Sequence, residues 1–159
     1  MKKLIFLSLL ALFAAGCAGG GNTESNNSTD KSAESQEQAP STDTYDPNRG
    51  EGKFTDVKVG DKLDPAMAQR GEKLADLKCI SCHKLTDEKL VGPGWAGVTK
   101  RHKPEWIMNF MTNTDVMIDK DPKVQAMLEI CMVRMPNQNL SDDDARDILE
   151  FLRKNDGVK

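Results

Sequence analysis

The sequence predicts a small all-α domain built from a few short helices. Three segments begin in a way that is typical of helices: Asp64-Pro65, Asp121-Pro122 and Ser141. In each, a residue that can cap free N–H groups precedes proline or acidic residues. Apolar residues follow each start at three- and four-residue spacing, and Gly and Pro collect between the segments. The folded part has about 100 residues, which is enough for one domain.

Residues 79–83 read Cys-Ile-Ser-Cys-His, and this pattern is the attachment site of a covalent haem. Cys79 and Cys82 can each form a thioether to one porphyrin vinyl group, and His83 then faces the iron as an axial ligand. Its other ring nitrogen needs an acceptor that sets the tautomer. The pattern occurs once, so one haem c is expected.

Two other interpretations of residues 79–83 are open. A redox dithiol would need a preceding strand in a βαβ unit, whereas the residues before Cys79 have a helical pattern. A zinc site could combine these residues with Cys131, but two adjacent residues rarely bind one tetrahedral ion and the second half of the chain lacks a paired ligand motif.

The chain begins with the pattern of an export signal. Two lysines precede an apolar run over residues 4–15, which is too short to span a membrane, and small residues follow. We therefore expect residues 1–16 to be a signal peptide. The end of this segment resembles a bacterial lipobox, in which Cys17 would be lipidated, although Ala14 stands where leucine is usual. The alternative is a plain soluble periplasmic protein.

Residues 17–59 are expected to form a lipidated N-terminus and a disordered tether, and residues 60–159 the folded domain. From Ala18 to about Arg49 the only sizeable apolar side chain is Tyr45, so this stretch cannot offset its ordering entropy. Residues 17–59 carry four basic and eight acidic side chains, against sixteen and seventeen in residues 60–159. Neither part is basic enough to indicate nucleic-acid binding.

The first helix is expected to begin at Asp64-Pro65 and to lead the chain to Cys79. Gly71 in its interior costs roughly 1 kcal/mol relative to alanine, and a close helix crossing is the usual compensation. The expected inner face combines apolar and small residues at helical spacing: Met67, Gly71, Leu74, Ala75 and Leu77.

Three further helices are expected after a Gly- and Pro-rich loop over residues 91–98. One opens at Pro104 and carries Trp106, Ile107, Phe110 and Met111. The next opens at Asp121-Pro122 with an inner face of Val124, Met127, Leu128 and Cys131, which makes Cys131 a buried thiol without an evident disulfide partner. The last opens at Ser141, and its apolar face is Ala145, Ile148, Leu149 and Leu152.

These motifs together resemble the class I cytochromes c over residues 64–154. The resemblance implies a small all-α fold wrapped round the haem, with a glycine at the crossing of the first and last helices. It also implies that the Pro93 carbonyl accepts a hydrogen bond from His83, that Trp95 packs on the porphyrin, and that Met135 is the sixth iron ligand. Met132 and Met117 are the competing methionines.

A basic run over residues 100–103 precedes the helix at Pro104, where cations oppose the helix dipole. Haem propionates nearby would account for the run, with Arg101 as their contact and Trp106 as an indole donor. A simply solvated run is the alternative. His102 is not expected to bind the iron, because it lies in a run expected to be exposed.

The sequence therefore predicts a monomeric electron carrier in the bacterial cell envelope, anchored to a membrane on the periplasmic side and docking transiently with redox proteins. We expect no enzyme activity and no small-molecule substrate. Residues 103–107 and 135–140 also resemble small cytochrome lipoproteins that accompany nitrous-oxide reductase in some bacteria, which suggests a terminal or nitrogen-oxide reductase as partner. The rival functions are a haem sensor or a peroxidase-like protein with an open sixth iron position.

Overall fold

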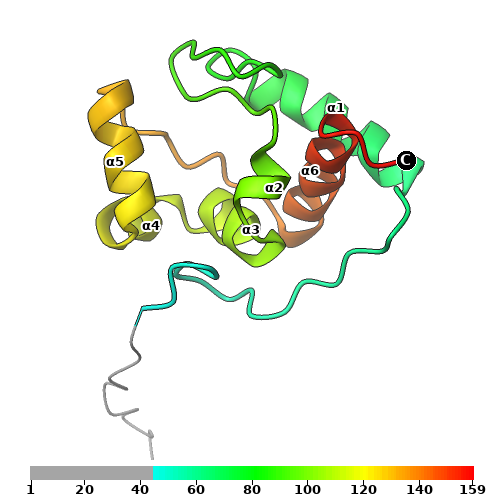
Figure 1. Ribbon diagram of the computed structural model, residues 1–159, viewed down its shortest axis with the longest axis horizontal. Coiled ribbons are helices and arrows are strands. Elements are labelled where there is room, and N and C mark those ends of the chain that lie inside the picture. Colours follow the sequence, from blue (N-terminus) through cyan, green and yellow to red (C-terminus); the bar gives the residue numbers. More distant parts are fainter. Residues whose placement is uncertain (1–44) are drawn as a thin grey trace, which may run out of the picture. The chain divides into compact units, whose positions relative to one another are not determined.

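The structure is a computed structural model that describes residues 45–159. Within this range the chain forms six helices and no strand, which confirms the all-α prediction (Figure 1). They are α1 (Pro65–Lys78), α2 (Val98–Arg101), α3 (Pro104–Thr112), α4 (Thr114–Lys120), α5 (Pro122–Cys131) and α6 (Asp142–Asn155). None of the helices in residues 45–159 has the length and apolar character needed to cross a membrane. The predicted signal peptide and Cys17 lie outside the described residues.

The expected helix starts are confirmed, because each predicted capping side chain forms hydrogen bonds to backbone N–H groups of the first turn. The Asp64 carboxylate accepts from the backbone N–H groups of Ala66 and Met67 at 2.9 Å, with proline at the first helical position. Asp121 caps α5 in the same way. Ser141 and Asp144 form a reciprocal capping box at the start of α6. Each cap satisfies N–H groups that the first turn leaves without a helical partner.

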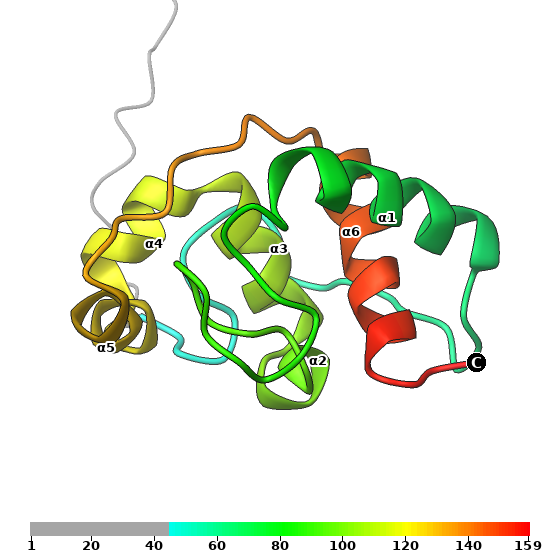
Figure 2. The same ribbon diagram turned by 90° about the horizontal axis from the view of Figure 1, so that it is seen from above.

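Helices α1 and α6 cross at Gly71, as the sequence predicts (Figure 2). A β-carbon on Gly71 would overlap the carbonyl oxygen of Asp147 and lie 2.8 Å from the amide nitrogen of Ile148. The buried face of α1 consists of three small residues, Ala68, Gly71 and Ala75. The prediction that Leu77 belongs to this face is wrong: its side chain is 82% exposed. Close backbone contact replaces large side chains in this interface.

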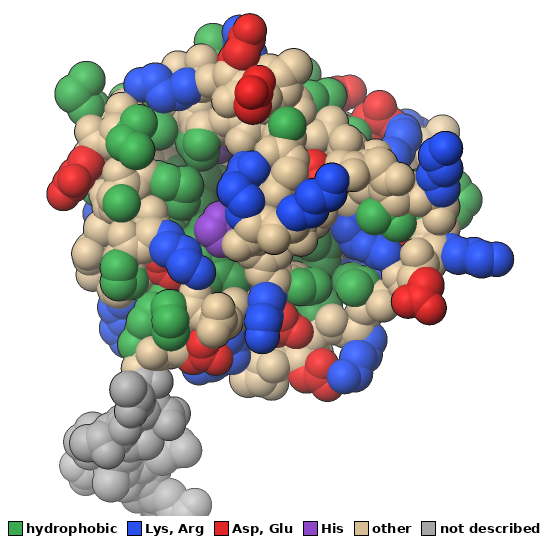
Figure 3. Space-filling model, in the orientation of Figure 1, with side chains coloured by type: hydrophobic (Ala, Val, Ile, Leu, Met, Phe, Trp, Pro, Cys, Tyr) green, Lys and Arg blue, Asp and Glu red, His purple; other side chains and the backbone are tan. Residues whose placement is uncertain are grey.

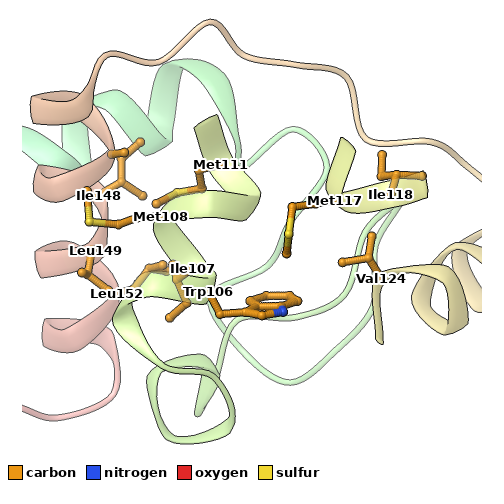
Figure 4. Close-up of a cluster of buried hydrophobic side chains, with 11 residues drawn as sticks. Trp106, Ile107, Met108, Met111, Met117, Ile118, Val124, Ile148, Leu149 and Leu152 are labelled. Atoms are coloured by element: carbon orange, nitrogen blue, oxygen red, sulfur yellow. The ribbon is translucent and has the colours of Figure 1, made fainter. Parts of the chain in front are cut away.

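The main core lies between α3, α4 and α6 (Figure 4). The predicted face of α6 is confirmed, since Ala145, Ile148, Leu149 and Leu152 are all buried. Opposite it, α3 contributes Trp106, Ile107, Met108 and Met111, and α4 contributes Met117 and Ile118. Helix α4 follows α3 after a single intervening residue, and it was not expected from the sequence because no side chain caps its start. The short α2 was not expected either: it begins at the last residue of the predicted loop and runs into the basic segment.

The predicted start of the domain at residue 60 is wrong, because residues 45–59 also belong to it. Phe54, Val57 and Val59 pack against the core, so the segment is part of the domain and not of a tether. The buried Asn109 holds it in place: its amide nitrogen donates to the carbonyls of Arg49 at 3.0 Å and Phe54 at 2.9 Å, and its amide oxygen accepts from the Phe54 N–H at 3.0 Å. Composition alone could not reveal this packing, because one polar side chain on a distant helix satisfies the backbone of the segment.

Candidate haem site

Helix α1 ends at the Cys-x-x-Cys-His turn and positions it. The backbone N–H groups of Cys82 and His83 both donate to the carbonyl of Cys79 at 3.0 Å, which brings the three functional side chains onto one tight turn. Cys79 is buried and Cys82 is half-buried. Burial raises the pKa of the Cys79 thiol to about 11, so the free thiol is protonated at neutral pH.

His83 is fixed in one tautomer by the predicted hydrogen bond, which is confirmed. Its Nδ1 donates to the Pro93 carbonyl at 2.8 Å, and since a carbonyl can only accept, Nδ1 carries the proton. Nε2 therefore keeps its lone pair, as an iron ligand requires. Burial lowers the pKa of His83, an effect that the hydrogen bond to Pro93 partly opposes, so the neutral ring is favoured.

Gly92 and Trp95 enclose the imidazole of His83. A β-carbon on Gly92 would overlap Cε1 of the ring and lie 2.8 Å from Nδ1, so only glycine leaves the ring in this place. The amide of Gly92 donates to the Cys82 carbonyl at 2.8 Å, which ties the loop back to the attachment turn. The Trp95 indole stacks on His83 with ring centroids 5.0 Å apart. The loop thus restricts the orientation of the predicted proximal ligand.

Two adjoining apolar pockets of about 180 and 80 Å³ lie beside this turn. Cys79 lines the larger pocket and Cys82 the smaller one, while His83 and Met135 line both. Figure 3 shows a hollow with largely hydrophobic walls and a histidine within it, and Lys and Arg side chains beside it. A flat apolar group attached through two thioethers fits this arrangement. Each cysteine lines a different pocket, and both pockets are lined by His83 and Met135, the two predicted axial ligands of the iron.

The structure excludes two of the three methionines that the sequence offered as the sixth ligand of the iron. Met132 is 83% exposed, whereas Met117 is buried in the core, and neither residue lines the pockets. Met127, on the predicted inner face of α5, lines both pockets with Met135 and was not considered as a ligand from the sequence. Met111 lines only the larger one. Methionines at helical spacing are more often core residues, so the sequence offered no signal that singled out Met127.

The predicted propionate contacts need one correction. Arg101 lines the larger pocket, and its guanidinium donates to the carbonyls of Gly94 and Ala96. Trp106 also lines it, but its indole N–H already donates to Asp121 at 2.7 Å and is not free for a propionate. His102 was expected to be exposed, but it is half-buried and stacks on Trp106 with centroids 3.8 Å apart.

Cys131 is also placed differently from the prediction. It is half-buried and lines the smaller pocket, so it belongs to the wall of the site and not to the core. Among residues 45–159, no three His, Cys, Asp or Glu side chains are grouped so that they could hold a metal ion. The zinc alternative therefore lacks a ligand set in the described part of the chain.

A helix-borne Cys-x-x-Cys-His turn, a histidine with a fixed tautomer and a shared apolar pocket define a c-type haem protein. The comparisons agree: the family model described as "Cytochrome c" matches residues 68–156. The chain belongs to the cytochrome c family. It carries haem c attached covalently through Cys79 and Cys82, and it takes part in haem-based electron transfer with redox protein partners.

Solved structures support the assignment. Cytochrome c from Rhodothermus marinus is 39% identical and superposes with a TM-score of 0.64, over 66% of this chain and 90% of that one. An engineered form of it is 38% identical over the same shares, with a TM-score of 0.63. The engineered form bound to a carbene intermediate is also 38% identical over those shares, with a TM-score of 0.60. No curated protein gives a significant match.

Proposed function

We propose that the protein is a dedicated electron carrier, not an enzyme, with His83 and Met135 as the axial ligands of its haem. The observation that carries the proposal is that both side chains line both halves of the apolar site. Met127 shares this position, and the resemblance of the Met135-Pro136 segment to class I cytochromes c favours Met135. The haem supplies one-electron exchange between ferric and ferrous iron. A thioether ligand stabilises the reduced state relative to a second histidine, so Met135 would set a comparatively high potential.

The protein's own residues orient the site and limit its exposure to water. Pro93 and Gly92 hold the His83 ring, as described above. The other proposed ligand, Met135, lies in the non-helical segment between α5 and α6. Lys78 donates to the Gln138 carbonyl at 3.0 Å and Arg134 to Asp119 at 2.9 Å, so this segment is tied on both sides of Met135. These contacts favour a closed, six-coordinate site.

The alternative is a haem sensor or a peroxidase-like protein in which the sixth position is open. It differs from the carrier in one observable property, the occupancy of that position. Absorption spectra of protein matured in a haem-attaching periplasm separate the two functions. A low-spin spectrum with the weak far-red sulfur-to-iron band is expected. A high-spin ferric spectrum, together with ready binding of carbon monoxide by the ferrous protein, would favour the sensor instead.

The partner surface that we propose lies at the mouth of the smaller pocket. Val91 and Val133 line this pocket and are exposed, and Lys89 lies next to it through a 3.1 Å hydrogen bond to the Ile130 carbonyl. A small apolar rim with a lysine beside it suits brief docking of a redox protein with acidic groups. We further propose that a terminal or nitrogen-oxide reductase is the physiological partner and that the carrier is a monomer.

We also propose that the protein is tethered to a membrane of the bacterial envelope, on the periplasmic side, by a lipid on Cys17. The support is the sequence of residues 1–17 and the polar composition of the segment that follows. Because residues 45–59 belong to the domain, the proposed tether covers residues 18–44. Coil statistics give such a segment a typical reach of roughly 30 Å, enough to bring the haem domain to neighbouring membrane proteins.

Substitution Cys17→Ser tests the anchor. The variant is expected to leave the membrane fraction almost completely while keeping the absorption spectrum of the wild type, because residue 17 is far in sequence from the haem domain. Fractionation followed by haem staining measures membrane retention, and the absorption spectrum of the released protein measures the second property. Cys131→Ser, which removes a thiol that no lipobox precedes, is the matched control and should stay membrane-bound. Equal retention of the Cys17 variant would refute the anchor.

A further inference from the structure

Asp121 is a fully buried carboxylate whose two oxygens bind two different sets of donors. Its Oδ1 caps α5 by accepting from the backbone N–H groups of Lys123 at 2.7 Å and Val124 at 3.0 Å. Its Oδ2 accepts from two side chains, the Tyr45 hydroxyl and the Trp106 indole N–H, the latter at 2.7 Å. A helix cap needs only the first set of bonds. Capping therefore does not explain why the second oxygen joins two aromatic side chains.

The two side chains on Oδ2 are a phenol and an indole, the aromatic groups of proteins that lose an electron most easily. Since each hydrogen bond spans about 3 Å, the Tyr45 oxygen and the Trp106 nitrogen lie within about 6 Å of each other. Trp106 is buried in the core and lines the larger haem pocket (Figure 4). Tyr45 is half-buried and reaches solvent. The pair thus links the haem pocket to the surface of the domain.

We propose that Trp106, Asp121 and Tyr45 form a path that carries oxidising equivalents from the haem to the protein surface when hydrogen peroxide reacts with the holoprotein. The path goes beyond electron carriage between redox proteins, because it protects the haem from oxidative bleaching. It rests on the haem pocket, to which Trp106 belongs, and does not depend on which residue is the sixth ligand.

The electrons and protons of this reaction balance. Conversion of one hydrogen peroxide to two water molecules breaks the O–O bond and takes two electrons from the haem and two protons from the solvent. The path returns these electrons one at a time: Trp106 gives one to the haem and receives one from Tyr45, whose phenol passes its proton to the Asp121 carboxylate. An external one-electron reductant, such as ascorbate, then restores Tyr45, and Asp121 returns the proton.

The hydrogen bond from Tyr45 to Asp121 suits this proton transfer. Burial raises the pKa of Tyr45, and the hydrogen bond to Asp121 and the charge of that residue raise it further, so the phenol is neutral at neutral pH. A neutral phenol that loses an electron becomes strongly acidic and must release its proton. Asp121 already accepts the hydrogen bond, so the proton can move without any rearrangement of heavy atoms.

Tyr45 is fixed beside Trp106 by the segment that follows it. The amide of Gly50 donates to the Asp46 carbonyl at 2.8 Å and closes a turn. A β-carbon on Gly50 would lie 3.3 Å from Cδ1 of the Trp106 indole, so the turn lies directly against this ring. On the other side, the Lys123 ammonium donates to the Pro47 carbonyl at 2.7 Å. The position of the phenol is therefore set by several contacts and not by its own hydrogen bond alone.

Electron paramagnetic resonance of the holoprotein, frozen shortly after addition of hydrogen peroxide, tests the path. The chain contains one tyrosine, so a neutral tyrosyl radical can only be that of Tyr45. This signal is expected in the wild type and, with larger amplitude, in Met135→Ala, whose iron we expect to be open to peroxide. Ascorbate should remove it. On longer incubation two such radicals should couple into a dityrosine-linked dimer, which a denaturing gel detects.

Three variants of the holoprotein remove one member of the path each. Tyr45→Phe keeps the ring without the phenol and should give no tyrosyl signal, no dimer and faster peroxide-driven loss of haem absorbance. Asp121→Asn keeps a residue that caps helices but removes the proton acceptor. Trp106→Phe keeps an aromatic ring that is much harder to oxidise. The Asp121 and Trp106 variants should both lose most of the tyrosyl signal.

Met117→Leu is the matched control for packing. Met117 belongs to the same buried cluster as Trp106 but is not on the path, so the tyrosyl signal should persist. Equal loss of the signal in this control and in Trp106→Phe would overturn the proposal, as would an undiminished signal in Trp106→Phe. If the core variants do not mature, Tyr45→Phe decides the matter, because equal bleaching of this variant and wild type contradicts the path.

The wild type alone can also refute the path. Absence of a tyrosyl signal from both the wild type and Met135→Ala, or a radical confined to tryptophan, would overturn it. The spectrum of the untreated ferric wild type separately reports the spin state of the iron. High-spin iron in that sample would overturn the carrier function but leave the path through Tyr45 intact.

Discussion

Substitution Met135→Ala is expected to open the sixth coordination position of the iron. The far-red sulfur-to-iron band should disappear, and cyanide should bind the ferric protein readily. The potential should fall by more than about 0.1 V, within the range of about 0.8 V that axial ligands span, because ferrous iron loses its thioether. Covalent attachment at Cys79 and Cys82 should persist, as a denaturing haem stain can show. Absorption spectra and redox titration measure the change.

Two methionines provide the controls for this experiment. Met132→Ala alters a side chain that is 83% exposed and should leave the band and the potential unchanged. Met127→Leu is the sharper control, since Met127 lines both pockets but leucine keeps most of its volume. If the band survives in the Met135 variant and is lost in the Met127 variant, the ligand lies on α5 and our assignment is wrong.

Substitution Gly71→Ala is expected to cost the domain about 2 to 3 kcal/mol of stability, the range of an overpacked interior. Alanine gains roughly 1 kcal/mol in helix propensity, but here the added carbon meets the backbone of α6 and not a side chain that can rotate away. The helices must separate. Because α1 also carries Cys79 into the site, the separation should disturb the haem pocket. Thermal unfolding of the ferric holoprotein should show a midpoint lower by roughly 10 °C.

The matched control is Gly60→Ala. A β-carbon on Gly60 would have its nearest neighbour at 3.5 Å, which is an ordinary contact. This variant should therefore differ from wild type by less than about 0.5 kcal/mol, as is usual for surface substitutions. Equal destabilisation of the two variants would show that close packing at Gly71 is not the cause.

The features that could be predicted from the sequence are those whose interactions are local. A cap such as Asp64 bonds to N–H groups two and three residues away, so its pattern is visible in a short window. The attachment turn spans only residues 79–83. Gly71 was also predicted, because a glycine inside a helix carries a known cost that a close crossing removes. Each of these inferences needs no knowledge of distant residues.

The features that the sequence did not reveal depend on partners far along the chain. Residues 45–59 join the domain because Asn109 satisfies part of their backbone, and the indole N–H of Trp106 is not free for a propionate because Asp121 accepts it. Leu77 has the helical spacing of a core residue but lies off the crossing with α6. The spacing of apolar residues in a short window predicts a helix. Which face of that helix is buried depends on the helix that packs against it.

The residues around the haem iron show the same difference between local and long-range interactions. Attachment and the proximal ligand follow from five adjacent residues, because covalent geometry alone brings two thiols and an imidazole to one porphyrin. The candidates for the sixth ligand that we propose are restricted by packing: Met117 is buried in the core, Met132 is exposed to solvent, and among the methionines of the described chain only Met127 and Met135 line both pockets. That selection involves α4, α5 and the segment before α6, whose positions are set by long-range contacts and not by any local pattern.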